Sequence, residues 1–194
     1  CALPIWILAM RTVEDMDKAI AWLYPNPQHA VILGGGFIGL ELAENLLKRG
    51  MKVTLVHRGN QLLSYLDPEL AIAVAQRVRA SGVDLRLGTS LSSFTRNSVT
   101  LDNGEVIETD VIFSAMGVRP EIHLAEESGL KIGSNGGIWV DHEQRTSDPN
   151  IFAVGDAAEK IDAISGDERL ATLAGLANRH GHSVANAIAG AHTV

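Results

Sequence analysis

The chain has 194 residues, of which 46% are hydrophobic, 20% charged and 5% aromatic, with 19 glycines and 6 prolines. This composition is that of a globular protein, and it excludes disorder, collagen-like repeats and a disulfide scaffold. The net charge of −7 argues against nucleic acid or an anionic membrane as a partner. Any nucleotide must therefore be bound locally, and the excess of glycine over the usual ~7% gives the first indication of where.

Cysteine usage and hydrophobicity restrict the protein class further. The only cysteine is Cys1, so a disulfide within the chain and a cysteine-based zinc site are impossible, and a cytoplasmic location is expected. We see no signal peptide and no apolar run near the ~20 residues of a membrane span. Residues 1–5 resemble a translated sequencing-adapter end, which gives the hypothesis that residues 1–6 are not native.

The first predicted helix begins after Thr12. Asp15 stands three residues later, as in a capping box, and the Pro-Asn-Pro run at 25–27 ends the helix. Hydrophobic residues recur in it at helical spacing: Met16, Ile20 and Leu23.

A strand–helix–strand unit follows. Residues 30–33 are a short, wholly apolar run typical of a buried parallel strand. Residues 37–49 predict an amphipathic helix that stops at Gly50, and residues 53–56 predict the next strand.

The rest of the chain predicts further α/β structure. Asp67 and Pro68 begin a helix that carries Leu70, Val74 and Val78, and residues 83–87 predict a strand. The hairpin signal at 102–104 predicts a small antiparallel meander, which returns to a buried strand at 111–113. Residues 136–140 predict another strand, 151–154 an apolar strand, and 170–190 a helix.

We therefore expect an α/β fold in two domains. Residues 1–120, with a core at 28–117, should form a Rossmann-like domain with a parallel sheet and the meander. Residues 121–194 should form a second segment.

The glycines at 34, 36 and 39 form a G-x-G-x-x-G pattern between the first strand and its helix. The first allows a tight turn, the second a close approach to a pyrophosphate, and the third close helix–strand packing. The helix N-terminus then favours the negative charge. Gly35, Phe37 and Ile38 complete the predicted dinucleotide turn; the alternative is a purely structural glycine-rich turn.

The residues after the second strand should read the adenosine ribose. His57 and Arg58 stand there in place of the acidic residue that accepts from the 2′-hydroxyl of NAD, and a cation can pair with a 2′-phosphate. NADPH is therefore favoured over NADH. The alternative is that Arg58 is a solvated loop residue and both cofactors are used.

Three other features are candidates for function. Glu41 follows the third glycine closely enough to approach a nicotinamide, and Asp156, after Gly155, offers a carboxylate at a strand edge or, alternatively, a helix cap. The histidines near the C-terminus, His180, His182 and His192, do not form a convincing metal site, because no cysteine or carboxylate completes a set of ligands.

Three ordered motifs resemble those of the flavin-dependent pyridine nucleotide–disulfide oxidoreductases. They are Gly34-x-Gly36-x-x-Gly39-x-Glu41, then Ala115-Met116-Gly117, then Thr146 through Gly155-Asp156. Residues 173–179 resemble most the coenzyme A disulfide reductase and NADH oxidase branch.

The resemblance implies a role for each residue. Gly34, Gly36 and Gly39 would bind the NAD(P)H diphosphate, Phe37 would gate the nicotinamide pocket, and Glu41 would face the nicotinamide. Gly117 would pass close to NAD(P)H, with Met116 a departure from the family's Ala-Thr-Gly. Asp156 would hydrogen-bond the ribityl chain of FAD, whose pyrimidine edge would meet the backbone around Ala174, Gly175 and Leu176.

The resemblance also implies that this chain is the middle of a longer enzyme. The family's first FAD-binding strand, its redox-active cysteine and its dimerisation domain would lie outside it, so no catalytic residue is expected here. The parent, a homodimer, would pass hydride from NAD(P)H to FAD and on to a disulfide, sulfenate or other small-molecule acceptor. Alternatives are a ferredoxin- or rubredoxin-reductase-like flavoprotein without a redox cysteine, and a non-catalytic NAD(P)-binding sensor module.

Overall fold

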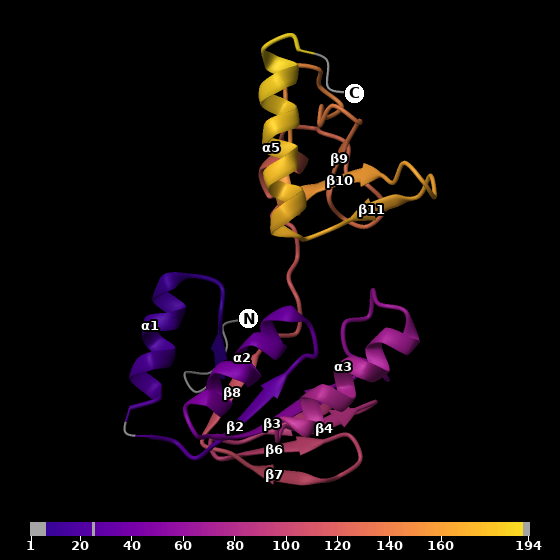
Figure 1. The fold of residues 1–194 in the computed structure, drawn as a ribbon. Helices are drawn as coiled ribbons and strands as arrows, with labels where there is room; N and C mark the ends of the chain where they lie inside the picture. The colour runs from indigo at the N-terminus through magenta and orange to yellow at the C-terminus, as the bar shows by residue number, and fades with distance from the viewer. Residues whose placement is uncertain (1–6, 25, 192–194) are drawn as a thin grey trace. The chain divides into compact units, whose positions relative to one another are not determined.

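The computed structural model describes residues 7–24 and 26–191, and the chain divides into two compact units, one up to Gly117 and one from Val118 (Figure 1). The residues hypothesised to be non-native, 1–6, lie outside the described part, as does His192.

The first unit is built on a five-stranded parallel sheet with the order β1-β8-β2-β3-β4. Its strands are β1 (Ile7–Ala9), β2 (His29–Leu33), β3 (Lys52–His57), β4 (Asp84–Leu87) and β8 (Val111–Ser114). The chain adds β3 and β4 on one side of β2, and then returns to place β8 on the other side. The strand order therefore reverses at β2 and β8, which is where open α/β sheets bind ligands.

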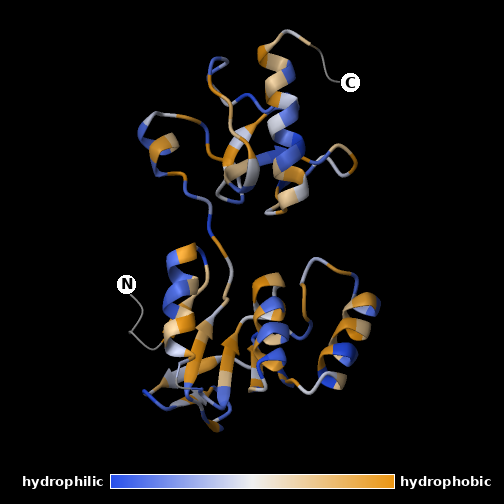
Figure 2. Ribbon diagram, turned by 60° about the vertical axis from the view of Figure 1, so that its left-hand side comes forward, coloured by the Kyte–Doolittle hydropathy of each residue, from blue (hydrophilic) through white to orange (hydrophobic). Residues whose placement is uncertain are grey.

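Each face of this sheet is covered by a different layer. The helices α1 (Val13–Trp22), α2 (Phe37–Lys48) and α3 (Pro68–Ala80) share one hydrophobic cluster with Ile32, Leu55 and Phe113. The opposite face, with Val31 and Ile112, packs against the antiparallel meander. The meander consists of β5 (Leu91–Phe94), β6 (Ser98–Leu101) and β7 (Val106–Glu108). Successive strand residues alternate between these two cores, and Figure 2 shows the strands as largely hydrophobic. The predicted fold class is confirmed.

The helices α1, α2 and α3 begin where the sequence predicts, and Leu46, Val74 and Val78 face the core as predicted, but other predicted residues are exposed. The helix predicted from residue 170 begins only at Ala174, because residues 168–170 form β11. Thr12 and Asp15 form the predicted capping box, in which the Asp15 N–H donates to Thr12 Oγ1 at 3.2 Å. Met16 and Ile20 are each 44% exposed, while Ala19 is buried. In α3, Leu70 is likewise exposed, and the small residues on the adjacent row, Ala71 and Ala75, face the sheet.

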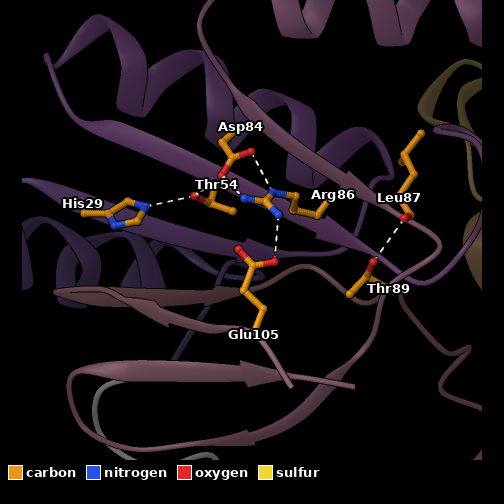
Figure 3. A network of polar contacts seen from close by, with 7 residues as sticks. All are labelled: His29, Thr54, Asp84, Arg86, Leu87, Thr89 and Glu105. Carbon is orange, nitrogen blue, oxygen red and sulfur yellow. Dashed lines mark hydrogen bonds and ion pairs between the residues drawn. The ribbon is translucent and has the colours of Figure 1, made fainter. Parts of the chain in front are cut away.

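A polar network ties the meander to the sheet (Figure 3). Arg86 on β4 pairs with Asp84 on the same strand and with Glu105 in the turn between β6 and β7, each at 2.8 Å. The buried Thr54 on β3 continues the network from Asp84 to His29, whose Nε2 lies 3.0 Å from Thr54 Oγ1. Polar contacts therefore supplement the hydrophobic core beneath the meander.

The second unit contains a three-stranded sheet of order β11-β10-β9, formed by β9 (Ile138–Val140), β10 (Ala158–Ile161) and β11 (Glu168–Leu170). It also contains α4 (His123–Glu127), the short 3-10 helix η1 (Gly155–Ala157) and α5 (Ala174–Ile188). The predicted strand at 151–154 is wrong: Phe152 makes an isolated bridge to Arg145, and the chain then turns into η1.

A buried carboxylate organises this second sheet. Glu159 has no exposed surface, and it accepts hydrogen bonds from the N–H groups of Gly137 and Asn135, both at 2.9 Å, and from Asn135 Nδ2 at 2.8 Å. Burial raises the pKa of Glu159, but these hydrogen bonds outweigh burial and hold the pKa below its usual value. In residues 7–24 and 26–191, no helix is long and apolar enough to cross a membrane.

Candidate functional site

The carboxyl ends of β2 and β8 meet at the glycine turn. Gly34 follows β2 with φ +118°, and its N–H donates to the Val56 carbonyl at 2.8 Å. A Cβ on Gly34 would overlap the carbonyl of Ala115, the residue that follows β8. Only glycine therefore fits this position, both for its left-handed backbone and for the close approach of the two chain segments.

Gly39 fixes the helix against this turn. It is buried in the first turn of α2, where a Cβ would overlap the Gly34 carbonyl and lie 3.6 Å from the Ala115 side chain. The third glycine thus permits close packing of the helix on the strand end, as the spacing predicts.

Gly36 differs from these two because it opens onto free space. It is the N-cap of α2, with φ −86°, and a Cβ there would meet nothing within 4 Å. The α2 N-terminus has no side-chain cap and no acidic residue in its first turn. Its unpaired N–H groups and positive dipole end are therefore available to an anion, and this space fits a diphosphate.

The other predicted residues of α2 stand at its first, second and fifth positions. Phe37 is 48% exposed at the first helical position, and its ring centroid lies 5.4 Å from that of Tyr65. Ile38 is half-buried against the core. Glu41 is exposed at the fifth helical position, two residues after Gly39. Tyr65 was not predicted as a site residue. What the sequence shows is an aromatic residue shortly before Asp67, the N-cap of α3, and this residue is exposed in the structure.

His57, the last residue of β3, and Arg58, the residue after it, behave differently. The Arg58 side chain is exposed. The half-buried His57 ring turns toward the glycine turn, where its Nδ1 accepts a hydrogen bond from the Gly35 N–H at 3.1 Å. Burial lowers the pKa of His57, and Arg58 lowers it further, whereas the Gln61 backbone opposes the shift. Proximity to Gly35 was not predicted for His57.

The segment that follows β8 is exposed beyond Ala115. Ala115 is buried against the core, but Met116 is 69% exposed. Gly117 has φ +104°, and a Cβ there would meet nothing within 4 Å. Ala115 lies close to Gly34, which was not predicted. This contact places the Ala115-Met116-Gly117 motif beside the glycine turn.

In the second unit, the predicted flavin residues also gather. Gly155 has φ +72°, and a Cβ there would lie 3.5 Å from the Ala177 side chain, because η1 packs on α5. Asp156 is exposed beside this contact. Three backbone-contact candidates lie in the first turn of α5, which has no acidic residue: Ala174, Gly175 and Leu176.

His180 is buried on α5, with Nε2 at 2.7 Å from the Lys160 ammonium. Burial lowers the pKa of His180, and Lys160 adds to the shift. His182 is exposed. Among the described residues, no group of three or more histidine, cysteine, aspartate or glutamate side chains is placed to hold a metal ion.

The parallel sheet, with its glycine turn between β2 and α2, is an α/β fold of the Rossmann type. A family model described as pyridine nucleotide-disulphide oxidoreductase matches residues 3–189, and the chain belongs to this family. The family uses FAD and NAD(P)H. The resemblance inferred from the motifs is therefore confirmed.

The relatives agree with this assignment. An NADH oxidase of Methanocaldococcus jannaschii is 34% identical over 95% of this chain, and a coenzyme A disulfide reductase of Staphylococcus aureus is 30% identical over 95%. The chain spans 42% of the length of each. The crystal structure of reduced Bacillus anthracis CoADR-RHD matches with a TM-score of 0.92 and 38% identity, covering 97% of this chain and 34% of that one.

Two related structures contain bound nucleotide. The water-forming NADH oxidase of Lactobacillus brevis, bound to NADH, has a TM-score of 0.84 and 27% identity, covering 97% of this chain and 42% of that one. An engineered NADPH oxidase derived from it, bound to NADPH, has a TM-score of 0.85 and 28% identity over the same shares. The engineered protein replaces an aspartate by alanine and introduces two arginines.

Proposed function

We propose that the unit up to Gly117 binds NAD(P)H across the carboxyl ends of β2 and β8. The observation that carries this proposal is the open Gly36 at the uncapped N-terminus of α2. The diphosphate would lie there, and Glu41, Met116 and Gly117 would flank the nicotinamide half. Phe37, whose ring lies 5.4 Å from that of Tyr65, would cover the nicotinamide ring.

The second unit would contribute to an FAD site. Asp156 would bind the ribityl chain, and the N-terminus of α5 would meet the flavin pyrimidine edge with backbone groups of Ala174 and Gly175. Support comes from the exposure of these residues and from the packing of η1 on α5, which holds Asp156 beside that N-terminus. Bound flavin would supply hydride acceptance, while this chain binds and orients the donor.

The whole enzyme would pass electrons from NAD(P)H through FAD to a disulfide, sulfenate or other acceptor, with its redox centre outside this chain. Coenzyme A disulfide reductases and NADH oxidases among the relatives support this reaction class. A homodimer and a cytoplasmic location stay predictions.

NADPH would be the preferred donor. The end of β3 offers the exposed Arg58 and no carboxylate, so a 2′-phosphate gains a cation and meets no repulsion. The engineered NADPH oxidase, in which an aspartate is lost and arginines are gained, supports the same interpretation.

Isothermal titration of the 194-residue chain with NADPH, NADH and ADP tests the proposal. We expect both dinucleotides to bind, with NADPH tighter, and ADP to bind more weakly. Failure of both dinucleotides to bind would refute the proposed function.

A further inference from the structure

The glycine turn is held by three contacts, all from the end of β3 and the loop that follows it. The Gly34 N–H donates to the Val56 carbonyl, the Leu63 N–H donates to the Gly35 carbonyl at 3.1 Å, and the Gly35 N–H donates to His57 Nδ1. Two of these contacts use backbone acceptors, which do not titrate near neutral pH. The third depends on the protonation state of an imidazole ring.

The structure encloses this ring between two glycines. A Cβ on Gly35 would lie 2.9 Å from His57 Cγ, and a Cβ on Gly59 would lie 2.9 Å from His57 Nε2. Neither glycine has a left-handed φ. Their lack of side chains is therefore explained by the space that the ring occupies, with Leu62 closing the Gly35 side.

Hydrogen bonding fixes the tautomer. A neutral imidazole has one donor and one acceptor nitrogen, so Nδ1 accepts from Gly35 and Nε2 carries the proton. Protonation turns both nitrogens into donors, and the buried Gly35 N–H then faces a second N–H.

We propose that His57 is a positioning residue for the dinucleotide turn: its neutral ring, bound to Gly35, holds the turn in the conformation that receives the diphosphate, and protonation releases it. The inference rests on the proposed function. It assigns His57 to the diphosphate turn shared by NADH and NADPH, in addition to the adenosine end where the sequence placed it.

The surroundings set the direction of the pH dependence. Burial is the main influence that favours the neutral ring, and the charged group that acts on the ring is Arg58, which also disfavours a second positive charge. The described neighbours that contact the ring or lie next to it are uncharged, namely Gly35, Gly59, Gln61 and Leu62. The turn is thus intact at neutral pH and is lost as the pH falls below the normal histidine range.

Affinity for NADH, measured by titration calorimetry from pH 7.5 to pH 5.5, tests the proposal. NADH is the suitable probe because the 2′-phosphate of NADPH itself titrates near pH 6, about where a histidine does. We expect wild-type affinity to fall progressively toward the acid end of this range, since the buried Gly35 N–H loses its acceptor when the ring is protonated.

Two variants separate positioning from a general structural effect. His57→Asn places a non-titrating oxygen acceptor near the Nδ1 position, so it should restore most of the affinity that His57→Leu loses at pH 7.5, without the pH dependence. His57→Leu removes the acceptor and should bind at least about fivefold more weakly at every pH. The inference is overturned if His57→Leu binds like wild type at pH 7.5, or if His57→Asn keeps the acid loss.

Nitrogen-15 NMR reports on the contact without nucleotide. We expect the Nε2–H tautomer at pH 7.5 and a Gly35 amide shift that follows the His57 ring titration. An Nδ1–H tautomer would refute the inference alone. If wild type binds no NADH at any pH, the proposed function and this inference fail together, whereas pH-independent binding by all three proteins refutes only the inference.

Discussion

The substitution Gly36→Ala should separate nucleotide binding from folding. Gly36 has φ −86° and open space around its Cβ position, so alanine fits the backbone without a clash. Alanine is a poorer N-cap than glycine, but it also lowers the entropy of the unfolded chain, and these effects of opposite sign nearly cancel. We expect the free energy of unfolding to change by less than about 0.5 kcal/mol.

The methyl group would nevertheless occupy the space proposed for the diphosphate. Losing one hydrogen bond to a charged group costs about 1.5–3 kcal/mol, which corresponds to a loss of NADPH affinity of about 13-fold to about 160-fold. Calorimetry measures the affinity, and urea unfolding measures the stability.

Gly39→Ala is the matched contrast, because its Cβ would overlap the backbone carbonyl of Gly34. Overpacking of this kind costs about 1–3 kcal/mol and should lower Tm by several degrees. The reasoning is refuted if Gly36→Ala binds NADPH as wild type does, or if it destabilises the fold as much as Gly39→Ala.

Three further outcomes follow from the contacts. Arg58→Ala should weaken NADPH about tenfold or more and leave NADH within about twofold, because a single charge-assisted contact is removed; equal losses for both nucleotides would contradict a 2′-phosphate role. Glu159→Gln should lower Tm, since its amide N–H₂ would face the N–H groups that donate to the buried carboxylate. An unchanged Tm would contradict a stabilising role for these hydrogen bonds. The pKa values of His29, His57 and His180 are lower in the folded chain than normal, so the unfolded chain binds protons first as the pH falls. The urea midpoint should therefore fall as the pH drops from 7.5 to 5.5, and a flat profile would contradict these pKa shifts.

Much of the first unit could be predicted because its pattern is local. The run at 30–33 is apolar on both faces, as a strand between two cores must be, and the glycines that follow it have fixed roles. The strand β1 was not predicted: it has three residues, and its partner β8 lies about 100 residues away along the chain. Burial of small alanines in place of Met16 and Ile20 depends on how closely α1 approaches the sheet, which periodicity does not encode.

The sequence predicted which positions belong to the site, but not which residues contact one another there. His57 and Arg58 were placed at the end of the second predicted strand, yet the direction of the His57 ring depends on the loop through Leu63. The strand β10 was missed because Glu159 is charged, and its burial is made possible by donors more than 20 residues away. Hydrogen bonds between a buried polar group and residues far along the chain leave no local pattern in the sequence.

The most direct test of dinucleotide binding at the β2–β8 edge is a titration of the nitrogen-15-labelled chain with NADPH, followed by amide NMR. Binding at the proposed site predicts the largest shifts in residues 34–39, 58 and 115–117, with smaller changes in the meander. An absence of shifts in the glycine turn at saturating NADPH, or shifts confined to other segments, would contradict it.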